Sequence, residues 1–189
     1  MFVPLLRYCD PLPWPPRRVL VAGSSGSGKT TLALLVARAW EMPYVELDSL
    51  FHGPGWVPRP AFQADVEQFA AQPRWVTEWQ YTDVLGPLLG ERADLVLWLD
   101  LPRRSVMSQL VRRTVIRRLR DEQLWNGNKE PRLRTVLTDP EHLVRWAWRN
   151  HGRAGIRVAD VLSRRGDDVA VVRLGARREL KVWVHRNLS

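Results

Sequence analysis

The sequence predicts a three-layer α/β fold in which helices cover both faces of a five-stranded parallel sheet. Short apolar runs alternate with longer amphipathic segments along most of the 189 residues, a pattern typical of parallel strands joined by crossover helices. A second observation is the pattern G-x-x-x-x-G-K-T at residues 23–30, between an expected strand and an expected helix. Third, acidic residues follow several of the apolar runs, at the edge where such sheets bind ligands.

The strands are expected where β-favouring apolar residues form short runs. The run at residues 19–22 leads directly into the glycine-rich segment, and the run at residues 94–99 is the most apolar. The expected strands are residues 19–22, 44–47, 75–77, 94–99 and 169–174.

Helices are expected between these strands, where start and stop signals bound amphipathic segments. Pro102 suits the first turn of a helix, while Asp139-Pro140-Glu141 marks the beginning of another long helix that Gly166 ends. The expected helices cover residues 31–40, 60–71, 83–89, 102–120, 139–166 and 177–187.

The chain is expected to form one domain of residues 19–189 behind a Pro-rich N-terminal extension, residues 1–18. Residues 121–139 have weak periodicity and a polar centre, which suits a lid that closes over a bound substrate. The single cysteine, Cys9, excludes an internal disulfide and fits a reducing compartment. No signal peptide or membrane span is expected, so the sequence predicts a cytoplasmic protein.

Residues 23–30 match the phosphate-binding loop of proteins that use nucleoside triphosphates. Glycines allow the tight turn that points successive N–H groups at phosphate oxygens, and the following helix adds its positive end. Lys29 would neutralise phosphate oxygens and Thr30 would ligate Mg²⁺. A glycine-rich turn without a ligand is the alternative. The expected nucleotide-binding residues are Gly23, Ser24, Ser25, Gly26, Ser27, Gly28, Lys29, Thr30 and Thr31.

Lys29 stands out because the other basic residues are almost all arginines. The chain has only three lysines, Lys29, Lys129 and Lys181. A compact ammonium fits inside a closed phosphate loop better than a guanidinium does. This exception supports the phosphate-binding interpretation.

Three carboxylates stand at predicted strand ends: Asp48, Glu78 and Asp100. Phosphoryl transfer needs an acidic group near Mg²⁺, and often one that orients the attacking hydroxyl. The alternative is that such a residue caps the next helix, which suits Asp100. Capping explains Asp48 poorly because a long loop is expected after it. Glu78 ends the strand expected to lie beside the phosphate loop.

The predicted helix 102–120 is rich in arginine. Arg113, Arg117 and Arg120 have the spacing i, i+4 and i+7, which places them on one face without interleaved acids. We expect this face either to clamp a transferring phosphate or to be a solvated basic surface. The net charge of +9 likewise indicates acidic partners or a general bias toward arginine.

The tryptophans fall into two groups. Trp56, Trp79 and Trp125 lie in loops or at strand ends, where each could stack on a base or an acceptor or pack beneath a loop. Three others occupy periodic apolar positions and are expected in the core: Trp40, Trp98 and Trp146.

From residue 19 to residue 188 the chain resembles the adenylate kinase-related P-loop kinases, which include shikimate, gluconate and cytidylate kinases. Within that family it is most similar to the subgroup called topology modulation proteins. The motifs that carry this resemblance are Leu47-Asp48-x-Leu50, Gly55-Trp56, Ala93-Asp94, Trp98-Leu99-Asp100-x-Pro102, Arg112-Arg113 and Leu124-Trp125-Asn126-Gly127-Asn128-x-Glu130.

The resemblance implies an ATP- and Mg²⁺-dependent phosphotransferase with a small-molecule acceptor. Asp48 corresponds to a carboxylate that contacts the acceptor hydroxyl or Mg²⁺, and Glu78 to the acid after the third strand. Arg113 and Arg117 match arginines that lead into the lid, Arg145 or Arg149 matches one beyond it, and the loop around Arg173 would lie against the adenine. The expected acceptor-binding residues are Asp48, His52, Trp56, Glu78, Trp79, Gln80, Trp125 and Arg149.

One departure concerns the acceptor. Relatives in the subgroup carry Asp-Gly-Asn-Tyr where this chain has Glu78-Trp79-Gln80-Tyr81. Tryptophan in place of glycine fills space beside the acceptor, which argues against an ordinary nucleoside monophosphate there.

Two other classes of protein are considered. An ATP-dependent nucleic-acid-binding or regulatory protein would use the arginines on phosphodiesters, but the chain lacks the interleaved aromatic and basic residues of single-strand platforms. A GTP switch is disfavoured because the D-x-x-G match at residues 83–86 falls in an expected helix, and Asn128-Lys129 is not followed by x-Asp.

Overall fold

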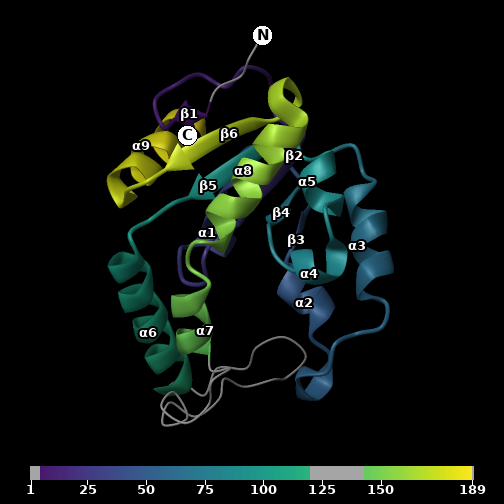
Figure 1. Cartoon of the computed structure of the whole chain (residues 1–189), viewed down its shortest axis with the longest axis vertical. Coiled ribbons are helices and arrows are strands. Elements are labelled where there is room, and N and C mark those ends of the chain that lie inside the picture. Colours follow the sequence, from purple (N-terminus) through teal and green to yellow (C-terminus); the bar gives the residue numbers. More distant parts are fainter. Residues whose placement is uncertain (1–4, 120–142, 189) are drawn as a thin grey trace.

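The computed structural model describes residues 5–119 and 143–188. Its centre is a wholly parallel sheet with the strand order β1-β6-β5-β2-β4-β3, visible edge to edge in Figure 1. The strands are β1 (Leu6–Arg7), β2 (Arg18–Gly23), β3 (Tyr44–Val45), β4 (Trp75–Glu78), β5 (Leu95–Leu99) and β6 (Ala170–Leu174).

The predicted fold class is confirmed, but the described sheet has six strands instead of five. The additional strand, β1, lies inside the expected N-terminal extension and pairs with β6 in the register Leu6↔Val172. It satisfies backbone groups at an edge that would otherwise face solvent, and it buries Leu6. Two residues are too few to give a periodic signal in the sequence.

The helices differ from the expected set in three places. The expected helix 83–89 is two helices, because Gly86 takes a left-handed backbone (φ 55°) and Pro87 follows it. Within the described part of the expected helix 139–166, a turn at residues 150–152 interrupts the helix. A short helix also follows β3 directly, where a loop was expected. The helices are α1 (Lys29–Ala39), α2 (Leu47–Phe51), α3 (Phe62–Ala70), α4 (Thr82–Leu85), α5 (Leu88–Arg92), α6 (Arg103–Leu119), α7 (Leu143–Arg149), α8 (Arg153–Arg165) and α9 (Arg177–Asn187).

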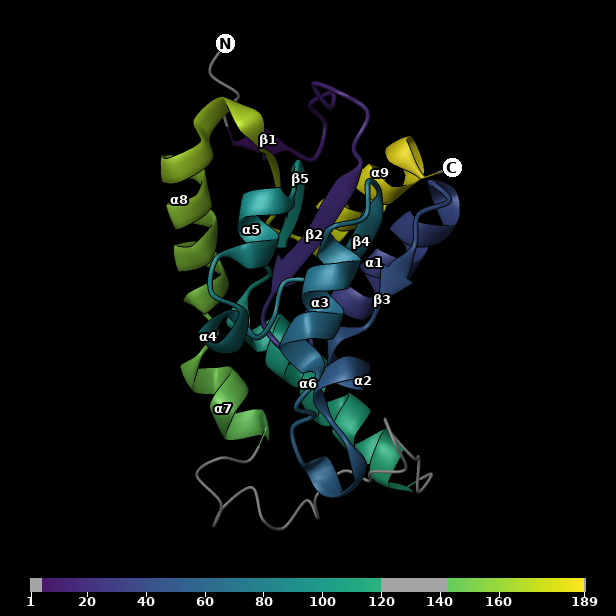
Figure 2. The same ribbon diagram turned by 90° about the vertical axis from the view of Figure 1, so that its right-hand side faces the viewer.

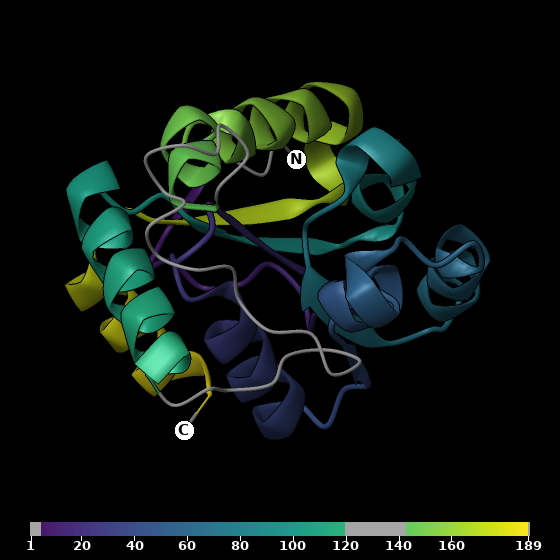
Figure 3. The same ribbon diagram turned by 90° about the horizontal axis from the view of Figure 1, so that it is seen from below.

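Each face of the sheet carries its own hydrophobic core. Alternation along β2 sends Val19 and Val21 to the face covered by α1 and α9, and Leu20 and Ala22 to the face covered by α3, α5 and α8. Figure 3 shows the sheet between α1 on one side and α7 and α8 on the other. Figure 2 shows α2 and α6 together at one end of the sheet. This end holds the phosphate loop.

Two of the three tryptophans expected in the core are partly buried against it, Trp40 and Trp98. The expectation for Trp146 is wrong, since its side chain is 41% exposed. Helix α7 turns the neighbouring Ala147 toward α6, and successive residues of a helix face different directions. Among the described residues, no helix has the length and apolar character needed to cross a membrane.

Candidate functional site

The glycines of the phosphate loop have backbone conformations that other residues rarely adopt. Gly26 (φ 84°) and Gly28 (φ 100°) are left-handed, and Gly28 directly precedes α1. A Cβ on Gly28 would meet no atom within 4 Å, so the loop is open at this point. A Cβ on Gly23 would come within 2.6 Å of the Ser27 hydroxyl oxygen. The loop therefore has both the conformation and the open space that bound phosphates require.

Helix α6 packs directly against this loop. A Cβ on Gly26 would lie 2.9 Å from the Cβ of Leu110 and 3.1 Å from the carbonyl oxygen of Val106. Both of these residues are buried in the middle of α6. The arginine-bearing helix is thus fixed beside the phosphate loop.

Lys29 is folded back into the loop that it follows. Its side chain is buried, and its Nζ donates a hydrogen bond to the carbonyl oxygen of Ser24 at 3.3 Å. A buried ammonium with one backbone acceptor lacks the several anionic partners that it can bind. Phosphate oxygens would supply them.

Four other charged side chains act on Lys29. Burial lowers the pKa of the Lys29 amine to about 8. The carboxylates of Asp48 and Glu78 oppose this shift in pKa, while the guanidinium groups of Arg113 and Arg157 add to it. The structure therefore brings three residues predicted from the sequence, Asp48, Glu78 and Arg113, into the surroundings of Lys29. Arg157 was not predicted.

Glu78 lies at the end of β4, next to Val21 of the strand that leads into the phosphate loop. It is completely buried, and the Tyr44 hydroxyl donates to its Oε1 at 2.9 Å. Burial raises the pKa of Glu78, although the hydroxyls of Thr30 and Tyr44 favour the charged carboxylate. Its other oxygen, Oε2, is buried without a partner in hydrogen-bond geometry. The predicted position of Glu78 beside the phosphate loop is confirmed.

Thr30 and Glu78 fit a magnesium ion held mainly by other ligands. The described residues contain no cluster of three His, Cys, Asp or Glu side chains that could form a complete metal site. Mg²⁺ does not need one, because it keeps several waters and takes one or two protein oxygens plus substrate phosphates. The Thr30 hydroxyl and the unpartnered Glu78 Oε2 are suitable oxygens.

Asp48 belongs to a hydrogen-bonded chain of three side chains. The Tyr81 hydroxyl donates to Asp48 Oδ1 at 2.5 Å and lies 3.1 Å from His52 Nε2. Tyr81 has a left-handed backbone (φ 55°) at the start of α4, and its ring stacks on Phe51 with centroids 4.3 Å apart. Sequence reasoning missed the role of Tyr81. The signal for it was the tyrosine that ends the segment 78–81.

His52 and Trp56 lie next to this chain. Their rings meet edge to face with centroids 4.9 Å apart, and Trp56 is half-buried with a positive φ of 63°. Burial lowers the pKa of His52, which favours the neutral imidazole. Gln80 is also half-buried, between Trp79 and Tyr81. These positions suit the predicted contacts of His52, Trp56 and Gln80 with an acceptor, which stay predictions.

The side chain of Trp79 points into the protein interior instead of the solvent. Only 4% of its surface is exposed, and a Cβ on Gly90 would lie 3.0 Å from its ring. The guanidinium of Arg157, from α8, lies over the same ring at 5.7 Å from the centroid. Of the two interpretations of Trp79, packing beneath a loop describes this arrangement better than stacking on a ligand.

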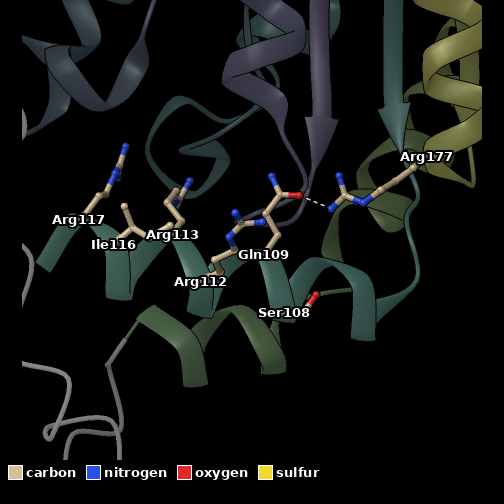
Figure 4. A pocket seen from close by; sticks show the side chains of 7 residues that line it. All are labelled: Ser108, Gln109, Arg112, Arg113, Ile116, Arg117 and Arg177. Carbon is tan, nitrogen blue, oxygen red and sulfur yellow. Dashed lines mark hydrogen bonds between the residues drawn. The ribbon is translucent and has the colours of Figure 1, made fainter. Parts of the chain in front are cut away.

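Two predicted arginines line an open pocket beside α6, with a volume of about 670 Å³. Figure 4 shows Arg113 and Arg117 projecting from the side of α6 that faces the end of β2. Arg177 donates hydrogen bonds to Gln109 Oε1 and, at 3.1 Å, to the Ser105 hydroxyl. The residues lining the pocket are Ser108, Gln109, Arg112, Arg113, Ile116, Arg117 and Arg177.

Arg173 forms an ion pair on the outside of the sheet. Its guanidinium binds Asp100 Oδ2 at 2.6 and 2.7 Å and lies 5.6 Å from the centre of the Trp98 ring. The expected capping role of Asp100 is wrong, because α6 begins only at Arg103 and the carboxylate is taken by Arg173. Contact of Arg173 with a nucleotide stays a prediction.

Trp125, Arg120 and the expected lid, residues 121–139, lie outside the described residues. Arg149 is exposed at the end of α7. The proposed contact between Arg149 and an acceptor remains a prediction.

The sequence matches no protein-family profile and no curated protein. The structure is similar to a sugar kinase from Janibacter sp. HTCC2649, with 18% identity, coverage of 91% of this chain and 92% of the other, and a TM-score of 0.46. It is also similar to a gluconokinase from Sinorhizobium meliloti 1021 (17% identity, 91% and 94% coverage, TM-score 0.45). A shikimate kinase from Bacteroides thetaiotaomicron gives 16% identity, 91% and 96% coverage and a TM-score of 0.46. The resemblance to the topology modulation proteins stays a prediction.

Proposed function

We propose that this protein is an ATP- and Mg²⁺-dependent phosphotransferase that moves the γ-phosphoryl group to a small-molecule acceptor. The observation that carries the proposal is the surroundings of Lys29. The charge of the buried amine is influenced by the carboxylate of Asp48 from α2, the carboxylate of Glu78 from the end of β4, and the guanidinium of Arg113 from α6. Phosphoryl transfer needs these groups together, namely cations for the transferring phosphate and acids for the metal and the nucleophile.

In this proposal each residue has a separate task. The backbone of residues 23–30 and Lys29 hold the phosphates, and Thr30 and Glu78 hold the metal. Bound Mg²⁺ supplies positive charge to the phosphate oxygens. Arg113 and Arg117 stabilise the negative charge that spreads over the transferring group. The oxygen–phosphorus bond to the acceptor forms as the bond to ADP breaks, and the hydroxyl proton leaves toward Asp48.

The contact with Tyr81 supports the role of Asp48. The Tyr81 hydroxyl donates a hydrogen bond to Oδ1 of Asp48 at 2.5 Å. This contact fixes the direction of the second carboxylate oxygen of Asp48. That oxygen is the one proposed to accept a hydrogen bond from the acceptor hydroxyl. Tyr81 is therefore a positioning residue in this mechanism.

The test is an ADP-release screen of purified protein with Mg-ATP and panels of sugars, sugar acids, nucleosides and nucleotides. We expect release that depends on one class of acceptor and phosphate transfer to that acceptor. Asp48→Asn should lose transfer but still bind Mg-ATP, because the charge that orients the hydroxyl is lost while the phosphate loop is intact. Asp160→Asn, which alters an exposed ion pair on α8, is the control and should transfer normally. Unimpaired transfer by Asp48→Asn would contradict the mechanism.

A further inference from the structure

Arg157 is a half-buried cation without an acidic partner. Its Nε is buried and has no hydrogen-bond partner. Among the residues that the structure describes, no carboxylate lies within ion-pair distance of its guanidinium. Asp83, whose carboxylate acts on Arg157 electrostatically, forms an ion pair with Arg153 at 3.8 Å. Buried charges are normally paired, because removing an ion from water is costly.

The position of Arg157 is fixed by Trp79. The guanidinium lies 5.7 Å from the centre of the Trp79 ring, and that ring is held in the core with 4% exposure. A cation over an aromatic face is attracted to the ring, which offsets part of the lost hydration. The ring offers no acceptor for the N–H groups of the guanidinium, so these donors can bind another molecule.

Arg157 also lies near the end of β4 that carries Glu78, because its guanidinium packs on Trp79, the next residue. It acts electrostatically on Lys29, but more weakly than Arg113 does. Its supporting residue, Trp79, follows Glu78 and precedes the segment that carries Tyr81, the partner of Asp48. This places Arg157 at the same end of β4 as Glu78, next to the strand that leads into the phosphate loop.

We propose that Arg157, supported by Trp79, binds an anionic group of the acceptor, a carboxylate or a phosphate ester. The inference rests on the proposed phosphotransferase function and specifies its substrate class. A guanidinium matches both anions through two parallel N–H···O bonds. Tryptophan at position 79 holds the arginine in place. The acceptor then carries both a hydroxyl for Asp48 and an acid for Arg157.

The first test measures binding without turnover. The phosphate loop is filled with Mg²⁺ and a non-hydrolysable ATP analogue, and inorganic phosphate is titrated by calorimetry. We expect Arg157→Gln to bind phosphate about tenfold or more weakly than the wild type, because a charge-assisted contact is lost. Arg157→Lys should keep part of the affinity. The matched control is Arg153→Gln, one turn earlier on α8 and exposed, which should bind as the wild type does.

Two results of this titration would overturn the proposal. One is phosphate binding by Arg157→Gln equal to that of Arg153→Gln. The other is no phosphate binding by the wild type. Thermal unfolding of each variant shows whether it is folded. If Arg157→Gln is unfolded, Arg157→Lys tests the proposal instead. Lysine keeps the positive charge but lacks the two parallel N–H donors of the guanidinium, so this variant should bind phosphate more weakly than the wild type.

The second test identifies the anion with matched pairs of acceptors, gluconate with glucose and AMP with adenosine. We expect the wild type to phosphorylate the acidic member of one pair at least about tenfold faster than its neutral partner, and Arg157→Gln to reduce this preference. Equal use of acidic and neutral members contradicts the role of Arg157. Absence of ADP release with every acceptor counts against the phosphotransferase itself, and the phosphate titration then still decides whether Arg157 binds anions.

Discussion

At the scale of single residues, the buried amine of Lys29 has an unusual protonation equilibrium. Its pKa of about 8 results first from burial, and the nearby carboxylates only partly compensate. Without a ligand, a substantial part of the population is therefore neutral just above neutral pH. A bound triphosphate places negative oxygens beside the amine and stabilises its charged form, so binding raises this pKa.

We predict that Mg-ATP binding takes up a proton near and above pH 8. Below that pH the amine is already charged in the free protein, so uptake disappears. As the pH rises through about 8, binding must first protonate Lys29, and the affinity should fall by up to about tenfold per pH unit. Calorimetry in two buffers with different ionisation enthalpies measures the uptake. Lys29→Met should show weak binding without a buffer effect, and the same heat in both buffers for the wild type would refute the prediction.

At the scale of elements, α6 and the phosphate loop form one packed unit. The contact is made by Gly26, whose missing side chain allows Leu110 and Val106 to approach. If α6 moved, either the phosphate loop would move with it or the arginines on α6 would shift relative to the loop. This contact explains how arginines from a distant part of the sequence are held near Lys29.

We predict that Gly26→Ala destabilises the protein more than a matched glycine substitution does. The new methyl group would lie 2.9 Å from Leu110 in a left-handed backbone, costing about 1–3 kcal/mol for overpacking and about 1–2 kcal/mol for conformation. Gly55→Ala also has a left-handed backbone (φ 69°, ψ 23°), but its new methyl group meets no atom within 4 Å, so only the conformational cost applies. Denaturant unfolding measures both, and equal losses would show that α6 adapts without strain.

The elements that could be predicted from the sequence are those with a local signal. Apolar runs identify the strands from β2 to β6, and the position of Glu78 beside the phosphate loop follows from parallel strand order. Arg157 could not be predicted, because its contact with Trp79 depends on how α8 packs across the sheet. The role of Tyr81 could not be predicted for a similar reason, since its contact with Asp48 needs a left-handed turn before α4. The expected loop after Asp48 was wrong because α2, only five residues long, carries too little periodicity.

At the scale of the whole molecule, the net charge of +9 favours binding to polyanions. Several arginines form ion pairs with carboxylates of the same chain. Arg59 pairs with Asp65 at 3.1 Å, Arg173 with Asp100 at 2.6 Å, and Arg164 with Glu91 and Asp160. The remaining positive charge still favours nonspecific contact with nucleic acids at low salt.

We predict that such contact is electrostatic and separate from turnover. Binding of a labelled single-stranded DNA, followed by fluorescence anisotropy, should weaken steeply between about 50 and about 200 mM salt, because each phosphate contact releases a counterion. Adding the DNA should not accelerate ATP hydrolysis, measured as free phosphate. DNA-dependent release of phosphate would instead favour an ATP-dependent nucleic-acid-binding protein over a phosphotransferase.

The protonation state of Lys29 has a consequence for chemical labelling. An unprotonated amine is a nucleophile, and a buried lysine with a pKa of about 8 is in this form far more often than an ordinary lysine. The chain offers only two other lysine side chains as competitors. An acylating or sulfonylating reagent carried on an adenosine scaffold would therefore meet one strongly reactive amine at the end of the phosphate loop. This side chain is a natural attachment point for a covalent inhibitor or an occupancy probe.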